Sequence, residues 1–99
     1  MSAKADIVVG RHGTSATGTV GNETFTIVDE FGKHKIKKGK IASIRFAVPE
    51  QQVQDDMQLL VGDLLVGEII DEKIFLHVEV TDEDLTFRKD QVLAIVFGR

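Results

Sequence analysis

The 99-residue chain has no cysteine, tryptophan or tyrosine and only one proline. Without cysteine, a disulfide framework, a thiolate metal site and a thiol nucleophile are all excluded. No apolar run is long enough to cross a bilayer as a helix. The N-terminal segment also lacks the apolar core of a signal peptide, so we expect a soluble, cytoplasmic protein with no membrane partner.

The residue types that carry catalysis are few and scattered. The three histidines and three serines stand at spacings that suggest no catalytic triad. His77 and Glu79 would share one face of a strand, where a polar surface pair is the commoner interpretation and a metal pair the alternative. The segment Gly10-Arg-His-Gly13 has two glycines but no following helix to cradle a phosphate. We therefore expect no enzymatic activity, no cofactor and no metal site.

The chain contains one motif twice. Residues 36–46 and 87–97 lie 51 positions apart, and each has an apolar residue, two basic residues, a turn-compatible residue, a polar residue and a strand ending in Ile-x-Phe. This echo predicts an internal repeat. We expect a first β-meander over 1–48, a helix or linker over 49–61 and a second β-meander over 62–99, as separate units or as a single compact domain.

Short alternating segments predict antiparallel meanders in both halves. The expected strands cover residues 5–9, 14–20, 24–29, 33–37 and 41–46, and then 63–70, 74–80, 85–88 and 92–97. Gly21-Asn22 is a hairpin signal. The loop Asp71–Lys73 is interpreted as two residues longer than its counterpart in the first half.

One segment, near residues 50–60, has helical periodicity. Val53, Met57, Leu60 and Val61 fall at i, i+4, i+7 and i+8, and the proline that precedes the segment suits a first helical turn. The pattern predicts a helix of about three turns, with a polar linker as the alternative.

Two further patterns recur in both halves. A glycine interrupts a strand in Ala16-Thr-Gly18-Thr-Val20 and in Leu65-Val-Gly67-Glu-Ile69, which favours a sharply curved strand. A closing pattern of apolar and basic residues runs over 36–44 and 87–95. Together these features resemble the Sm-like family of small β-barrels. The resemblance implies short-stranded antiparallel meanders in one or two Sm-like or SH3-like barrels, or one larger barrel or sandwich made of two related halves. It also implies assembly into a homo-oligomeric ring.

The chain departs from the pattern of RNA-binding Sm-like proteins, which resemble each other in an Asp-x-apolar-x-Asn loop and an Arg-Gly pair. The comparable hairpins, Phe25–Asp29 and Leu76–Val80, lack the asparagine, and Arg88 is followed by Lys89 rather than glycine. These departures argue against base-specific RNA binding and leave ring assembly as the stronger implication of the resemblance.

A basic run over residues 33–40 is the strongest nucleic-acid signal. On a strand, Lys33, Lys35 and Lys37 would form a ridge able to meet phosphates. The run has no aromatic residue for base stacking, and edge strands carry lysine to prevent aggregation. We favour an edge or oligomer interface over nucleic-acid contact. The residues proposed for either contact are Lys33, Lys35, Lys37, Lys38, Lys40, Arg88 and Lys89.

Charge and hydropathy supply three further interface signals. Residues 1–49 carry a net +4 and residues 50–99 a net −8, which favours halves that attract or copies that dock head to tail; drift of charge over solvated faces is the commoner explanation. Asp82-Glu-Asp84 could dock the lysine ridge of a neighbour or bind a cation, or simply form a solvated hairpin tip.

The segment 92–97 is apolar throughout, so we expect it to be covered on both faces. Its oligomer-interface candidates are Val92, Leu93, Ile95, Val96 and Phe97.

These features favour a non-catalytic oligomerisation or protein-interaction module that assembles through strand edges. The alternative is an Sm-like nucleic-acid-binding protein that uses the basic strand at residues 33–40.

Overall fold

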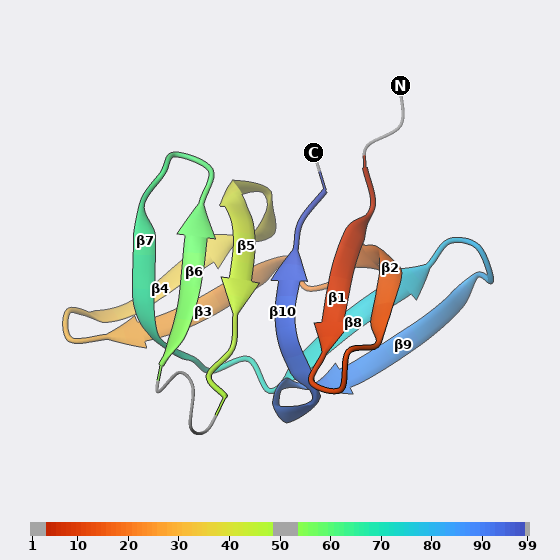
Figure 1. The fold of residues 1–99 in the computed structure, drawn as a ribbon. Coiled ribbons are helices and arrows are strands. Elements are labelled where there is room, and N and C mark those ends of the chain that lie inside the picture. The colour runs from red at the N-terminus through yellow and green to blue at the C-terminus, as the bar shows by residue number, and fades with distance from the viewer. Residues whose placement is uncertain (1–3, 49–53, 99) are drawn as a thin grey trace.

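The computed structural model describes residues 4–48 and 54–98, which form ten strands of one antiparallel sheet (Figure 1). The first half of the chain supplies β1 (Asp6–Gly10), β2 (Ser15–Val20), β3 (Thr24–Asp29), β4 (Gly32–Lys37) and β5 (Ile41–Arg45). The second half supplies β6 (Asp55–Leu59), β7 (Leu64–Ile69), β8 (Lys73–Val78), β9 (Glu83–Arg88) and β10 (Val92–Val96). Single 3₁₀ turns, η1 (Lys38–Lys40) and η2 (Lys89–Gln91), precede β5 and β10. The mainly β fold is confirmed.

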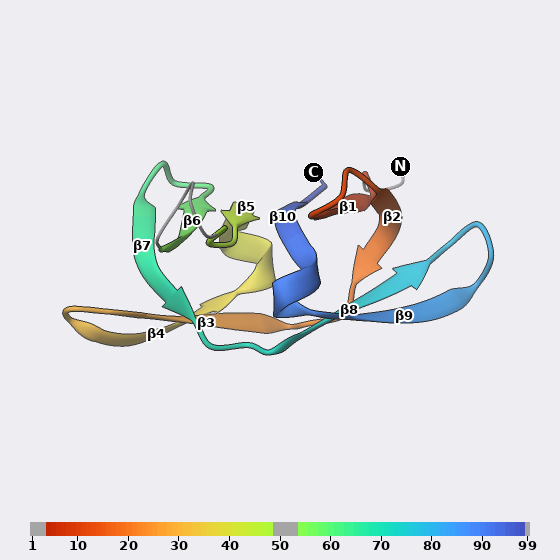
Figure 2. The same ribbon diagram turned by 60° about the horizontal axis from the view of Figure 1, so that its bottom comes forward.

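The sheet is curled and open. Its strand order is β4-β3-β7-β6-β5-β10-β1-β2-β8-β9, so β4 and β9 are the two edges. Six strands, from β7 to β2, form one layer, and the hairpins β3–β4 and β8–β9 fold back to form the second (Figure 2). The result is a half-barrel, and the expected closed Sm-like or SH3-like barrel is not confirmed.

The helix expected near residues 50–60 is not confirmed either. Residues 55–59 form β6, which pairs with β5 on one side and β7 on the other. Residues 49–53 lie outside the described part of the chain, and Leu60 and Val61 belong to the turn that follows β6. Among the described residues there is no α-helix. Pairing on both sides of β6 satisfies its backbone groups, and this overrides the helical spacing of its apolar residues.

The internal repeat is present as two runs of five strands. The spacing is 49 positions from β1 to β6 and 51 positions from β5 to β10. The two additional residues do not lie at Asp71–Lys73, where we expected them. They lie in the turn between β8 and β9, which spans residues 79–82 and compares with the two-residue turn of residues 30–31.

The repeats exchange strands, so neither repeat makes its own sheet. Strand β3 of the first repeat pairs with β7 of the second, and β2 of the first pairs with β8 of the second. At the centre β5 and β10 pair with each other, Ile44 facing Ile95. Every repeat therefore needs the other to complete its hydrogen-bonded ladders.

Gly18 and Gly67 lie at the bends that this exchange requires. Gly18 pairs with β1, whereas Thr19, the next residue, pairs with His77 of β8. Gly67 stands at the same point of β7. A Cβ at Gly18 would overlap the carbonyl oxygen of His77, and one at Gly67 would overlap that of Val28. Only glycine permits so close a backbone approach, and the sharp curvature expected at both residues is present.

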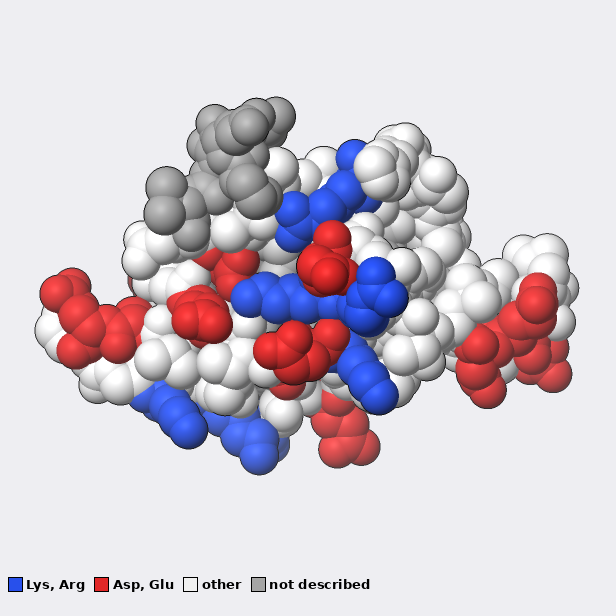
Figure 3. All heavy atoms as spheres, turned by 90° about the horizontal axis from the view of Figure 1, so that it is seen from below, with Lys and Arg blue, Asp and Glu red and all other residues white. Residues whose placement is uncertain are grey.

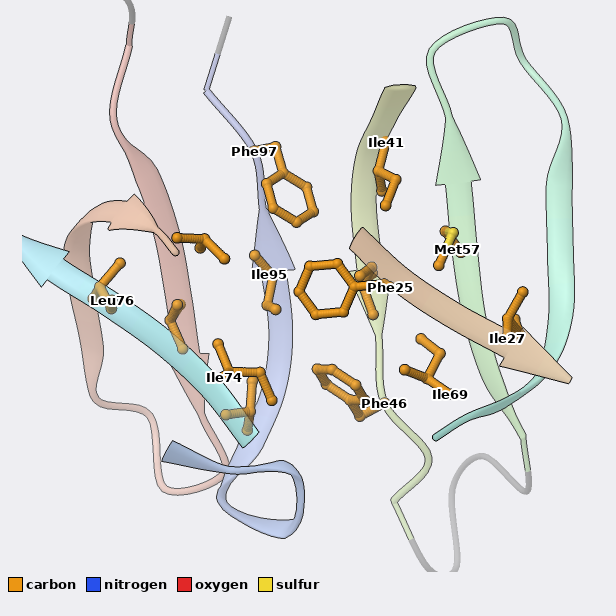
Figure 4. Close-up of a cluster of buried hydrophobic side chains, with 14 residues drawn as sticks. Phe25, Ile27, Ile41, Phe46, Met57, Ile69, Ile74, Leu76, Ile95 and Phe97 are labelled. Atoms are coloured by element: carbon orange, nitrogen blue, oxygen red, sulfur yellow. The ribbon is translucent and has the colours of Figure 1, made fainter. Parts of the chain in front are cut away.

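The core lies between the two layers (Figure 4). Phe25 of β3 packs edge-to-face on Phe97, which follows β10, with ring centroids 6.0 Å apart. The other fully buried large side chains come from both repeats. They include Ile27, Ile41, Ile44, Phe46, Met57, Ile69, Ile74, Leu76, Val92 and Ile95. Burial of each such side chain stabilises the fold by about 1.5–3 kcal/mol, and both repeats share this core.

Candidate functional site

A buried ion pair lies at the start of β1. The carboxylate of Asp6 accepts hydrogen bonds from the backbone N–H groups of Val20 at 2.9 Å and Gly98 at 2.8 Å. Lys38 Nζ lies 3.0 Å from the same carboxylate and donates to the carbonyl oxygen of Val20 at 2.7 Å. Because Gly98 belongs to the second repeat, Asp6 joins the two repeats.

The second repeat contains the same arrangement. Asp55, only 2% exposed, accepts from the N–H groups of Ile69 at 2.8 Å and Ala47 at 2.6 Å. Lys89 Nζ lies 2.7 Å from the Asp55 carboxylate and donates to the Ile69 carbonyl at 2.7 Å.

These two pairs change the interpretation of the basic residues. Lys38 and Lys89, proposed from sequence as contact residues, instead hold buried carboxylates. The two aspartates were missed. The sequence carries a signal for them, since Asp6 and Asp55 match at the 49-residue spacing and the lysines match at 51.

The other proposed lysines lie on the surface. Lys33, Lys35 and Lys37 are exposed on β4 and alternate with less exposed residues, as expected for one face of a strand. Their partners on β3 are Val28, Thr26 and Thr24, and none of these is aromatic. Lys40 is exposed in η1, away from this row. The ridge therefore consists of three lysines on a free edge of the sheet.

The opposite edge begins with acidic residues. Asp84 on β9 and Asp82 in the preceding turn approach the His77 ring, with nitrogen–oxygen distances of 2.8 and 3.0 Å, and Glu79 lies 4.0 Å away. The hydrogen bond to Asp84 raises the pKa of His77 above its usual 6.5, and the surrounding carboxylates add to this against a smaller effect of desolvation. The β8–β9 hairpin thus combines these three carboxylates with one titratable histidine.

The apolar segment proposed as an interface divides between the two faces of the sheet. Val92, Ile95 and Phe97 are buried in the core. Leu93 is partly buried, and Val96 is 47% exposed on the outer face of the central layer. Only these last two residues can contribute to contact with a partner.

The underside of the molecule, seen in Figure 3, gathers Lys and Arg side chains toward its middle, with acidic groups among them and at both ends. Arg11 and Arg88 line two neighbouring cavities, of about 470 and 380 Å³. Arg88 Nε lies 3.1 Å from Asp90, which also lines both cavities. The sequence predicted a contact at Arg88 but not at Arg11. Arg11 is a single arginine in a turn, and no periodic or repeated pattern of basic residues surrounds it.

Within residues 4–48 and 54–98, no group of three or more His, Asp or Glu side chains is arranged to hold a metal ion. In the same residues, no helix has the length and apolar character needed to cross a membrane.

Comparison with known proteins gave no relative. No protein-family model, curated protein or solved structure matches this chain.

Proposed function

We propose that the protein is a non-catalytic self-association module in which β4 of one copy adds to β9 of the next. The observation that carries the proposal is an open sheet with two free edges, one rich in lysine and the other acidic where it begins. The β4 edge presents Lys33, Lys35 and Lys37, whereas the β9 edge begins with Asp82 and Asp84. A free edge offers unpaired backbone N–H and C=O groups to another strand.

The charges select which edges meet. Two β4 edges would place lysines opposite lysines, which repel. Two β9 edges repel where carboxylates face each other and attract only in the register that sets Asp84 opposite Arg88. The unlike pair places lysines opposite carboxylates. Because that contact is head to tail, it produces a ring if the rotation closes and an open chain if it does not.

An antiparallel register satisfies the charges best. With Lys37 opposite Asp82, Lys35 falls opposite Asp84 and Lys33 opposite Thr86. Each exposed charge pair contributes only about 0.2–1 kcal/mol. The affinity therefore comes mainly from the backbone ladder, and the charges determine specificity and salt dependence.

A charge exchange tests the proposal. Variant one carries Lys35→Glu and Lys37→Glu, and variant two carries Asp82→Lys and Asp84→Lys. Each variant alone carries like charges at positions 35, 37, 82 and 84 and should remain at the monomer mass of 10.9 kDa. Mixing them restores opposite charges at every junction and should restore association.

Light scattering on a sizing column measures the mass. The wild-type protein should gain mass with concentration at low salt and lose it at high salt. A wild-type monomer under all conditions, or a mixture that stays monomeric, would refute edge pairing.

The ridge of exposed lysines also supports a second candidate, binding of single-stranded RNA. Contact with phosphates would give an affinity that falls steeply with salt, by about 0.7 in the logarithmic slope for each phosphate neutralised. Variant one would abolish this binding, whereas variant two would strengthen or preserve it. RNA binding that survives in variant one would rule out the ridge as the site.

A further inference from the structure

Arg11 lines both of the neighbouring cavities and lacks an acidic partner among the described residues. Arg11 is partly buried, and its Nη2 donates to the carbonyl oxygen of Ala47 at 2.8 Å. Its Nε is buried and has no hydrogen-bond partner. No ion pair to Arg11 is formed by the part of the chain that the structure describes. Partly buried arginines are normally paired with carboxylates. The charge of Arg11 therefore favours an anionic ligand at its Nη atoms, because Nε itself is buried.

The cavity around Arg11 combines charge with apolar walls. Val8, Ala16 and Phe87 supply apolar surface, and Arg88 adds a second guanidinium. The side chains of Thr14 and Ser15 also line it and could donate hydrogen bonds. Its volume of about 470 Å³ lies in the range of small-molecule sites.

The internal repeat shows that the fold does not require this composition. At the 49-residue spacing, four of the cavity residues are replaced by leucine in the second repeat. The matching pairs are Gly10 and Leu59, Arg11 and Leu60, Ser15 and Leu64, and Ala16 and Leu65. The same backbone thus accepts leucine at four positions where the first repeat has small residues or arginine.

We propose that this cavity binds a small organic monoanion, a carboxylate on an aromatic or similarly flat apolar body. The Arg11 guanidinium matches the planar fork of a carboxylate, and the apolar walls match the body. Arg88 adds positive charge but is already paired with Asp90. Asp90 lines the cavity and opposes a second negative charge on the ligand. Phosphate-rich ligands therefore fit less well. The proposal is independent of edge pairing.

Benzoate is the probe for the experiment, followed by amide NMR shifts in the full-length protein. We expect saturable shifts at residues 10–16 and 87–91, with a Kd of roughly 1 mM or lower. Benzyl alcohol lacks the charge and acetate lacks the body, so each should bind at least about tenfold more weakly.

Three variants localise the site. Arg11→Met should weaken benzoate binding about tenfold or more. Arg45→Met is the matched control, because Arg45 is exposed on β5 and does not line the cavity. Ala16→Leu introduces the residue of the second repeat and should block the cavity while the spectrum stays dispersed.

Two results would overturn the proposal: shifts that do not saturate in the wild-type protein, or equal affinity in the Arg11→Met and Arg45→Met variants. Arg11→Lys covers the case in which the methionine variant does not fold. The lysine variant retains the positive charge but loses the planar pair of N–H donors. Undiminished benzoate affinity in this variant would contradict recognition by a guanidinium.

Discussion

Replacement of Lys89 by methionine should reveal how much the buried ion pair contributes to stability. The change leaves the Asp55 carboxylate, 2% exposed, with two backbone N–H donors and no cation. Removal of one partner from a buried pair typically costs about 3–5 kcal/mol, against at most about 1 kcal/mol for a surface pair. The Lys89 side chain is 21% exposed, so water screens the pair in part and we expect a loss of about 3 kcal/mol.

Urea denaturation measures this loss. A change of about 3 kcal/mol should lower the midpoint by roughly 1–3 M, with an unchanged dependence on denaturant. Lys40→Met is the control, because Lys40 is exposed in the 3₁₀ turn of the first repeat, and it should change stability by less than about 0.5 kcal/mol. In an Asp55→Asn background, Lys89→Met should lower the free energy of unfolding by less than it does in the wild-type protein. The difference between the two losses measures the coupling between Asp55 and Lys89. A loss below about 1 kcal/mol in the wild-type background would refute the argument that the pair is buried and coupled.

Two further changes test the bends and the histidine. Gly67→Ala should destabilise the protein by about 3 kcal/mol or more, because its Cβ would overlap the Val28 carbonyl. Gly39→Ala is the control, because a Cβ at Gly39 has no neighbouring atom within 4 Å, and it should leave stability unchanged or raise it slightly. Equal denaturation midpoints for the two alanine variants would contradict the close backbone approach at Gly67. The pKa of His77 is raised in the folded protein, so its interactions stabilise the fold fully below 6.5 and are lost as pH rises through the folded value. The difference in free energy of unfolding between wild type and His77→Gln should therefore shrink above pH 6.5. A difference that grows instead would show that folding lowers the pKa of His77.

The strands that alternate clearly were predictable, whereas β6 was not. In β6 the buried Asp55 occupies an inward position where strand patterns normally have an apolar residue, so the alternation with Met57 is hidden. Met57 also fits the helical spacing with residues 53, 60 and 61. Local periodicity cannot distinguish these options; pairing with β5 and β7 decides them.

The exchange of strands between the repeats was equally hidden from sequence. It depends on contacts between residues far apart in the chain, such as Val28 with Glu68 and Thr19 with His77. The glycines at the bends were visible, but a glycine shows only that a strand curves and not which strand it joins next. Edge charges could be predicted because Lys33, Lys35 and Lys37 alternate along the sequence itself.

The internal repeat separates what the fold needs from what it does not. Both repeats retain features that the shared frame requires. These are the aspartates 6 and 55, the lysines 38 and 89, and the glycines 18 and 67. In contrast, Lys33 matches Asp84 at the edges and Arg11 matches Leu60 at the cavity. Because one backbone accommodates both members of each unlike pair, folding does not dictate the choice between them. Unlike positions also occur elsewhere, as in the pairs Ile7 and Asp56 or Arg45 and Val96, so a difference between the repeats frees a position from the demands of folding but does not by itself mark a binding site.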